Sequence, residues 1–135
     1  MKFISRDTDY TMRALVFMAS SSKKGAKHVI TVDEIVDELG LPKIFMRRTL
    51  QKLARHKILS SYKGKEGGFS LLKSASQISL VDIIKIFQGN IDLTNCLLRG
   101  KVCPEVKKCP LRKRLKKIGQ SLNKELNKIT VASLL

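Results

Sequence analysis

The chain has 135 residues, of which 27 are Lys or Arg and 11 are Asp or Glu, so its formal net charge is +16. This length fits one domain with an appendage and excludes two large domains. Apolar residues make up 43% of the chain and recur regularly among the basic ones, which argues against disorder. A charge of this size predicts an anionic partner, namely nucleic acid, an anionic membrane or an acidic protein.

The N-terminal ten residues mix Lys2 and Arg6 with Asp7 and Asp9. They lack the apolar stretch and the cleavage site of a signal peptide. The most apolar stretch nearby, 14–19, has six residues, whereas about 20 are needed for a helix to cross a bilayer. We therefore expect a cytoplasmic protein with no membrane partner.

The first three helices are predicted from apolar spacing and from capping residues. Residues 7–20 have helical periodicity, with Asp7 or Thr8 as the cap, and the polar stretch 20–28 predicts the end of this helix. A capping box of Thr and Glu at 31–34 starts a second helix, which we expect to end before a glycine at the left-handed C-terminal position. A proline then suits the start of a third helix, expected over 42–56.

Two short strands are expected at 58–63 and 69–72, on either side of the sequence Gly-Lys-Glu-Gly-Gly at 64–68. The glycines of this segment can adopt the positive φ that a hairpin tip requires. Two helices, a tight turn and a hairpin predict a winged helix-turn-helix. The expected fold class is therefore mainly α with a small β wing.

Ser79 and Asp82 form another capping box, which predicts a buried fourth helix, apolar on most sides and closed by Gly89. Residues 90–109 show no clear period and hold all three cysteines of the chain. Beyond them, leucines and isoleucines step by three or four residues, the stripe of one long amphipathic helix. The chain thus divides into a winged helix-turn-helix DNA-binding domain (1–89), a cysteine-bearing loop (90–109) and a C-terminal dimerisation helix with its tail (110–135).

Half of the net charge lies on the segment 43–65, which holds eight Lys or Arg residues and no acidic one. The major groove of B-DNA admits one helix, whose N-terminal half meets the base edges, and phosphate contacts position it. The residues expected nearest the bases are Lys43, Arg47, Arg48 and Gln51. Those expected to hold phosphates are Lys52, Arg55, Lys63 and Lys65. A merely solvated basic face is the alternative, and the adjoining turn and glycine wing favour DNA binding.

Four features occur in order along nearly the whole chain. They are the sequence TDYTMRAL at 8–15, Gly-Leu-Pro and the following helix at 40–59, the wing sequence GKEGGFSL at 64–71 and the late cysteine loop. Together they resemble the Rrf2 family of bacterial winged-helix transcription regulators, of the IscR, NsrR and RirA type. The resemblance implies a homodimeric repressor that binds double-stranded DNA at a pseudo-palindromic operator and is not an enzyme.

In iron–sulfur members of this family, three cysteines in the loop before the long helix bind a cluster. The matching positions here are Cys96, Cys103 and Cys109. Thiolates are the usual cluster ligands, and a loop can bring them together. An odd number of cysteines in a reducing compartment also argues against a disulfide framework. The resemblance thus implies operator binding that is tuned by an iron–sulfur cluster sensing redox state, iron or nitric oxide.

The chain departs from the family pattern at two places. The first gap between cysteines has six residues where five is usual, and Arg112 stands where IscR-type members have a histidine ligand. Because a guanidinium has no lone pair to donate to iron, this counts against a two-iron (2Fe-2S) cluster completed by histidine. In NsrR-type members the fourth ligand is an aspartate of the other subunit. The matching residue is Asp9, which favours a four-iron (4Fe-4S) cluster.

Several alternatives stay open on the sequence alone. A cluster-free family member would regulate through thiol oxidation or a protein partner. Independently of this, Asp9 could simply cap the first helix. The long helix could pack back on its own domain instead of pairing with a copy. From other classes, an RNA-binding protein would use the same charge, and a small electron-transfer iron–sulfur protein would explain the cysteines but not the helix-turn-helix.

Overall fold

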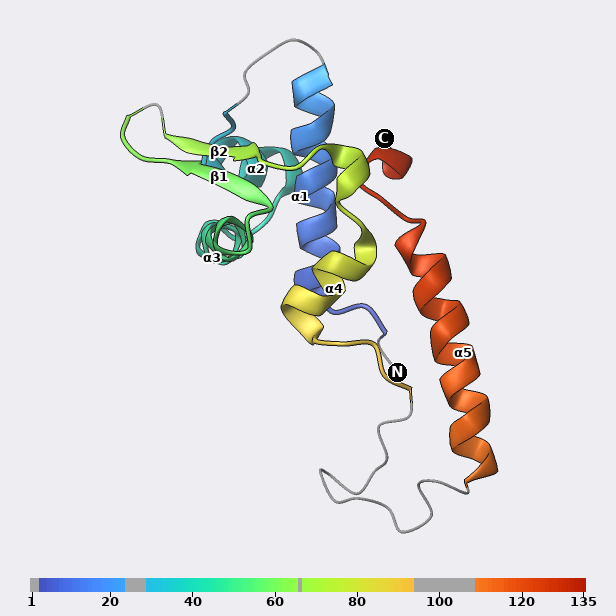
Figure 1. Cartoon of the computed structure of the whole chain (residues 1–135). Helices are drawn as coiled ribbons and strands as arrows, with labels where there is room; N and C mark the ends of the chain where they lie inside the picture. Colours follow the sequence, from blue (N-terminus) through green and yellow to red (C-terminus); the bar gives the residue numbers. More distant parts are fainter. Residues whose placement is uncertain (1–2, 24–28, 66, 94–108) are drawn as a thin grey trace.

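The computed structural model describes residues 3–23, 29–65, 67–93 and 109–135. In chain order its elements are α1 (Arg6–Lys23), α2 (Val32–Leu39), α3 (Lys43–Arg55), β1 (Leu59–Tyr62), β2 (Gly68–Leu71), η1 (Ala75–Gln77), α4 (Leu80–Gln88), α5 (Pro110–Asn127) and η2 (Ala132–Leu134). The fold is mainly helical with one two-stranded wing, as the sequence predicts. α1 runs through the middle, with α3 and the wing on one side and α5 on the other (Figure 1). Within the described ranges, no helix combines the length and apolarity of a membrane span.

The helix-turn-helix is fixed by local caps. The Thr31 hydroxyl accepts the backbone N–H of Glu34 at 3.1 Å, and the Glu34 carboxylate accepts that of Thr31 at 3.3 Å, which confirms the predicted capping box. Gly40 ends α2 with a left-handed φ of 65°, and its N–H donates to the Val36 carbonyl at 2.8 Å. Pro42 is the N-cap of α3, so this helix begins one residue later than predicted.

α1 is longer than the predicted 7–20, and its cap differs. Ser5 caps the helix, because its hydroxyl accepts the backbone N–H of Thr8 at 3.2 Å; the prediction of Asp7 or Thr8 is therefore wrong. At the other end, the serines predicted to form a linker continue the helix to Lys23. Ser22 donates its hydroxyl to the carbonyl of Met18 at 3.1 Å, a bond to the preceding turn that lets serine remain helical.

The core lies where α1, α3 and α4 meet beneath the wing. Leu15 and Met18 of α1 pack in one buried cluster with Leu50 and Leu53 of α3 and with Ile83 of α4. Truncating a fully buried leucine of this kind costs about 2–5 kcal/mol. The predicted apolar stripe of α3 is therefore the face that holds this helix to the domain, and its opposite face is left for solvent or a ligand.

Close backbone approaches shape the wing. Of its glycines, Gly64 has a positive φ, 104°, as predicted, but Gly67 and Gly68 do not. A Cβ added at Gly67 would lie 2.5 Å from the carbonyl oxygen of Tyr62, and one at Gly68 would lie 2.5 Å from that of Ile30. Gly64 thus provides the positive φ expected at the hairpin tip, whereas Gly67 and Gly68 are needed because no side chain fits there.

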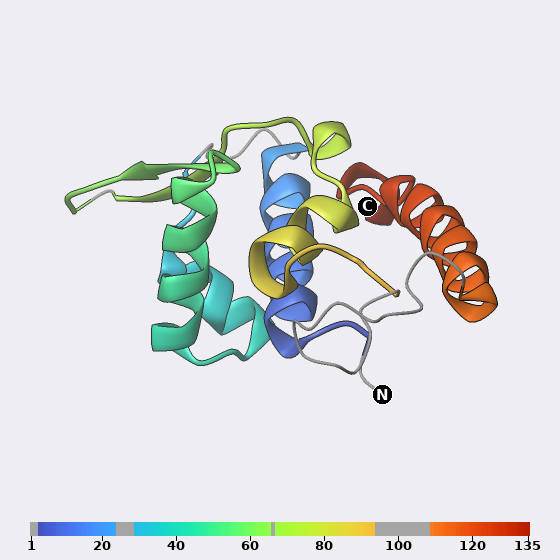
Figure 2. The same ribbon diagram turned by 60° about the horizontal axis from the view of Figure 1, so that its bottom comes forward.

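The wing is also tied to the entrance of α2. β1 and β2 pair antiparallel, from Leu59 opposite Leu71 to Tyr62 opposite Gly68. Ile30 and Phe69 exchange two backbone hydrogen bonds of 2.8 Å, so a third piece of chain pairs with β2. These bonds anchor the wing to the start of the helix-turn-helix. In Figure 2 the hairpin projects beyond α3.

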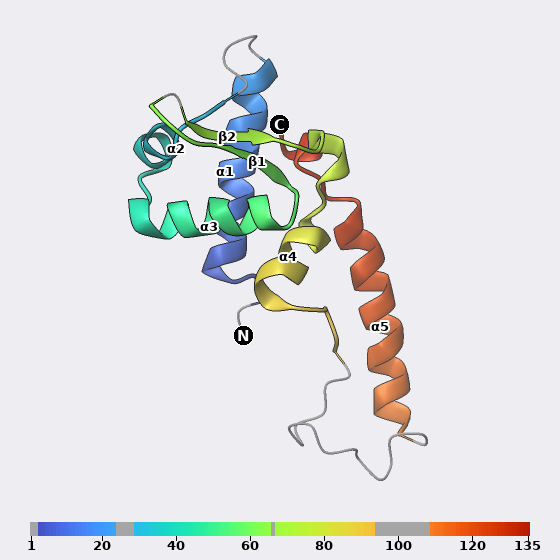
Figure 3. The ribbon, with the colours of Figure 1, turned by 60° about the vertical axis from the view of Figure 1, so that its left-hand side comes forward.

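α5 and the tail are joined to the head at the far end of the chain. Ser79 and Thr130 form a bridge, and the N–H of Val131 donates to the Ile78 carbonyl at 2.9 Å. Val131 is buried in the core. Figure 3 shows α5 running beside α4 and on past it, and α3 lying beneath the wing.

The predicted apolar stripe of α5 is divided between two directions. Leu115, Leu122 and Leu126 are half-buried, on the side that faces the head, whereas Leu111 and Ile118 are exposed. The half-buried leucines therefore pack on the chain's own head, as the alternative expects, but the rest of the stripe does not. The other half leaves an exposed apolar edge. By contrast, α4 is largely buried, as predicted.

Candidate nucleic-acid interface

One side of α3 is buried, and the opposite side forms a continuous exposed face. Met46, Leu50 and Leu53 point into the core, and the buried hydroxyl of Thr49 donates to the Phe45 carbonyl at 3.0 Å. Helical spacing of three and four residues brings the exposed side chains together on the other side. We call this the reading face; it consists of Ile44, Arg47, Arg48, Gln51 and Arg55.

A hollow of about 470 Å³ lies between the start of α2, α3 and the wing. Arg47 and Gln51 line it from α3, and Lys63 and Lys65 line it from the wing. The structure thus brings together side chains that the sequence assigns separately to base contacts and to phosphate contacts. Arg48 and Arg55 lie on the reading face without lining the hollow.

Lys43, the first residue of α3, is ion-paired. Its Nζ lies 2.8 Å from Oδ1 of Asp33 on α2, and both side chains are about half exposed. An exposed pair of this kind contributes less than about 1 kcal/mol, so it yields readily to a stronger partner. Asp33 places a negative charge at the edge of the hollow.

Lys52 lies on a different flank from the reading face. Its Nζ stands 5.1 Å from the centre of the Phe87 ring of α4, a cation–π contact, and the side chain is half-buried. Its assignment to a phosphate contact stays a prediction, and such a contact would be made from the α4 side of the helix.

Two exposed residues at this surface were not found from the sequence. Ile44 is 70% exposed in the first turn of α3. Tyr62 is exposed at the outer end of β1, with its hydroxyl 3.5 Å from the Ser70 Oγ that donates to it. Ile44 lies two positions before the buried Met46, which is about 200° around the helix axis, so its side chain points outward. This spacing from the apolar stripe is the sequence signal that could have identified it.

Of the three cysteines, Cys96 and Cys103 lie outside the described residues. Cys109 is a half-buried free thiol at the N-cap position of α5. Asp9 lies in the first turn of α1, where its Oδ2 is 3.2 Å from Nε of Arg13 and its side chain is 45% exposed. Since Ser5 caps α1, the alternative that Asp9 is the cap is wrong.

Across the part of the chain that the structure describes, no three His, Cys, Asp or Glu side chains lie close enough to hold a metal ion. The chemistry of the donors nevertheless fits an iron–sulfur cluster, because the Cys109 thiol is free and the Asp9 carboxylate is accessible at the surface. Within one chain the two groups lie at the starts of different helices: Cys109 is the N-cap of α5, and Asp9 lies in the first turn of α1.

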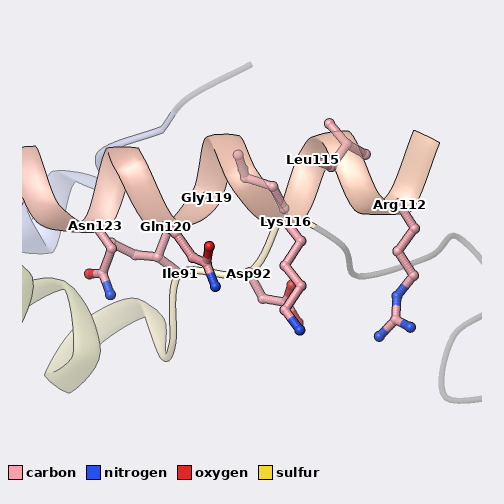
Figure 4. A pocket seen from close by; sticks show the side chains of 9 residues that line it. Ile91, Asp92, Arg112, Leu115, Lys116, Gly119, Gln120 and Asn123 are labelled. Atoms are coloured by element: carbon pink, nitrogen blue, oxygen red, sulfur yellow. The ribbon is translucent and has the colours of Figure 1, made fainter. Parts of the chain in front are cut away.

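A second hollow, of about 290 Å³, borders the described ends of the cysteine-bearing loop. Residues 91–93 form one wall, and Arg112, Lys116, Gln120 and Asn123 extend from one side of α5 toward it (Figure 4). Arg112, which replaces the histidine of the family pattern, therefore adds positive charge at this point. Cys109 lies three residues before it, at the start of the same helix.

Comparison with known proteins identifies the family and supports the fold. The family model for Rrf2, described as an iron-dependent transcriptional regulator, matches residues 4–135. Protein aau3 of Rhizobium meliloti is 27% identical over 132 residues, which cover 97% of this chain and 83% of the relative. A Rhodobacter capsulatus protein, described as an rrf2-like transcriptional regulator of the helix-turn-helix type, is 26% identical over 137 residues, with 98% and 91% covered.

Solved structures show the same fold. CymR (YrzC), described as the global cysteine regulator of B. subtilis, superposes with a TM-score of 0.77 at 19% identity and covers 99% of this chain and 96% of its own. IscR of T. potens gives 0.74 at 19% identity, with 99% and 85% covered. The oxidized form of Staphylococcus aureus CymR gives 0.71 at 23% identity, with 99% and 95% covered. The shared fold extends from the winged head through the C-terminal helix.

Proposed function

Because the chain belongs to the Rrf2 family of transcription regulators, we propose that it is a repressor whose operator affinity is tuned by an iron–sulfur cluster. Members of this family bind DNA as dimers and are not enzymes. The observation that carries the proposal is that Arg47 and Gln51 of the reading face and Lys63 and Lys65 of the wing line one hollow, which gathers base-reading and phosphate-binding side chains at one place. The operator would be pseudo-palindromic, with half-sites about 34 Å apart.

On this proposal α3 enters the major groove and the wing follows the backbone. Arg47 and Gln51, which line the hollow from α3, meet base edges, where arginine pairs with guanine and glutamine with adenine. Lys63 and Lys65 on the wing hold phosphates. Lys43 leaves Asp33 when a base or a phosphate is offered, because an exposed ion pair is weak. Arg48, Arg55 and Lys52 complete the set of proposed DNA contacts.

The dimer would form along the exposed edge of α5. Leu111 and Ile118 lie about 40° around the helix from the half-buried leucines four residues further on, at the edge of the same apolar stripe, and the head leaves this edge exposed. A two-fold pair buries this edge on both copies at once. We therefore propose that the chain consists of a DNA-binding head (1–89), a cysteine-bearing loop (90–109) and a dimerisation helix with its tail (110–135).

The cluster would be held by Cys96, Cys103 and Cys109, with Asp9 of the partner subunit as the fourth ligand of a 4Fe-4S centre. When bound, it supplies an anionic centre that responds to iron and to redox state. Cys109 ties one ligand to the first turn of α5, and Asp9 lies in the first turn of α1, inside the head. Ligation by both would couple the dimer helix of one subunit to the DNA-binding head of the other.

A second candidate is regulation by the thiols without a cluster. Arg112 removes the histidine ligand of the family pattern, and Cys109 is a free thiol at the start of a helix that carries many basic residues. The thiolate is the form that oxidants attack. One solved relative is described as a global cysteine regulator and another as an oxidized form.

Anaerobic purification with an absorption spectrum and iron and sulfide assays separates the two candidates. We expect a coloured protein whose spectrum and iron are lost in Cys96→Ser, Cys103→Ser and Cys109→Ser. A colourless, iron-free protein after reconstitution would reject the cluster. If thiol oxidants then change DNA affinity, and mass spectrometry finds the modified cysteines, the second candidate is supported.

The DNA-binding part is tested by selecting duplexes from a randomised pool, with structured RNA as competitor. Arg47→Ala should relax the preference at one base pair of each half-site and weaken binding by about 1–3 kcal/mol. Lys65→Ala should weaken binding to all duplexes alike and lower the salt slope by about one unit. Equal losses on every sequence for both variants would contradict these roles, and preference for the RNA would contradict the function.

A further inference from the structure

Ile44 lies at the N-terminal end of the reading face. It is the second residue of α3, and at 70% it has the largest exposed fraction among the large apolar side chains of the described residues. Arg47 and Arg48 lie three and four positions further on, at the spacings that make side chains neighbours on one helix face, and Gln51 lies on the same face about two turns away. All three are exposed.

The surroundings of Ile44 specify the chemistry of what it contacts. A single exposed apolar residue normally needs no explanation. Here, however, its helical neighbours are two guanidinium groups and an amide, and the segment 43–65 contains no acidic residue. An apolar protein surface would have to bury these charges to reach Ile44. The partner that suits this face is therefore anionic and offers a small apolar group between its polar ones.

The major groove of a DNA duplex has that composition. Among the base edges that face this groove, the apolar group is the C5-methyl of thymine, and the others are hydrogen-bond donors and acceptors. This inference rests on the proposed DNA-binding function and deepens it. We propose that Ile44 is a specificity-determining residue that packs against the C5-methyl group of a thymine in each half-site.

The spacing along α3 places that thymine near the base that Arg47 reads. Ile44 precedes Arg47 by three residues, which is about 4.5 Å along the helix axis. Successive base pairs are about 3.4 Å apart, so the two contacts fall within about two base pairs of each other. The preferred duplex should therefore contain a thymine adjacent or nearly adjacent to the guanine contacted by Arg47.

Replacing thymine by deoxyuridine tests the inference, because it removes the C5-methyl and leaves base pairing intact. The probe is the preferred duplex found by selection from the randomised pool, with one thymine replaced at a time. We expect wild-type affinity to fall about fourfold for the loss of one methyl contact. This should occur at one thymine of each half-site. Ile44→Ala should bind the thymine and deoxyuridine duplexes with equal affinity.

Leu72→Ala provides the matched control, since Leu72 is also an exposed large apolar residue but lies after β2, outside the reading face. It should keep the full wild-type response to deoxyuridine. Because Ile44 lies outside the core, Ile44→Ala should fold normally, which circular dichroism and Tm check.

The outcomes separate this inference from the function on which it rests. A preferred duplex that is insensitive to deoxyuridine at every thymine overturns the role of Ile44 and leaves DNA recognition intact. A response that persists in Ile44→Ala does the same. If selection finds no preferred duplex, the proposed function itself fails, and this inference fails with it.

Discussion

Nζ of Lys43 lies 2.8 Å from Oδ1 of Asp33, which joins the first residue of the proposed recognition helix to the helix before it. The pair borders the hollow that α3 and the wing form together. In this arrangement Asp33 has two effects on a DNA backbone, because it repels phosphate directly and neutralises a lysine that would attract it. Asp33 is thus expected to restrain non-specific binding.

Asp33→Asn should strengthen binding to all duplexes, because Lys43 no longer has to leave Asp33 and the phosphates no longer meet a carboxylate. The salt slope should rise by less than about one unit, since Lys43 contacts DNA in the wild type as well. Fluorescence anisotropy at several salt concentrations measures both quantities. Asp37→Asn is the control: Asp37 is exposed on the same helix, α2, but does not line the hollow. Weaker binding of Asp33→Asn would mean that the Lys43–Asp33 pair organises the site.

Gly67 is one of two positions in the wing where no side chain fits. In Gly67→Ala the new Cβ would lie 2.5 Å from the Tyr62 carbonyl oxygen, so the backbone of the hairpin must shift. We expect a loss of about 1–3 kcal/mol in the free energy of unfolding, with weaker binding to every duplex. Denaturant unfolding and anisotropy measure these effects.

Gly64→Ala is the comparison for this substitution. Its Cβ would meet open space, but its φ of 104° is unfavourable for alanine, so strain is the whole effect. The expected order of stability is wild type, then Gly64→Ala, then Gly67→Ala. If Gly67→Ala is as stable as wild type, the close approach does not constrain the wing.

Caps that use a few consecutive residues were predicted correctly, because everything that forms them is local. The pair Thr31 and Glu34 is an example. The start of α1 was not. Its cap bond, from the Thr8 N–H to the Ser5 hydroxyl, is local, but Ser5 and Thr8 are also held from far along the chain, because the Ser5 N–H and the Thr8 hydroxyl both donate to Oε1 of Gln88, at 2.9 and 2.7 Å. No local pattern in the first ten residues indicates that contact.

For the candidate DNA-binding surface, too, one part could be predicted from the sequence and another could not. The basic content of 43–65 was sufficient to predict an anionic partner, but the direction of each side chain depends on how α3 packs. The structure turns Lys52 toward Phe87 of α4 and leaves Ile44 outward, among charges. Charge counting selects residues such as Lys52 and passes over residues such as Ile44. Only the phase of the helix relative to the core separates the two.

The exposed edge of α5 predicts the oligomeric state. Ile118→Glu places a charge where two apolar edges would meet, and we expect it to convert the dimer into a monomer in sedimentation analysis. Asn127→Glu is the control, because nine residues along a helix lead to the opposite face and Asn127 is exposed. A dimer that survives in both Ile118→Glu and Leu111→Glu would place the interface elsewhere.

A role of Asp9 as a cluster ligand can be separated from a contribution of Asp9 to folding. Its carboxylate is paired with Arg13 at the surface, and such a pair contributes little to folding, so Asp9→Ala should leave Tm almost unchanged. If Asp9 of the partner subunit completes the cluster, the same variant should lose iron and alter the absorption spectrum of the anaerobic protein. The metal-free Asp9→Ala protein should bind DNA with the same affinity as the metal-free wild-type protein.

Asp7→Ala is the matched variant, since Asp7 is the other acidic residue in the first turn of α1. It should retain the wild-type iron content and spectrum. Equal iron content in the Asp9→Ala and Asp7→Ala proteins would show that another group is the fourth ligand. In that case the coupling between one subunit's head and the other's α5 would rest on the cysteines alone, and exchange of an external thiol for the missing ligand would become the next measurement.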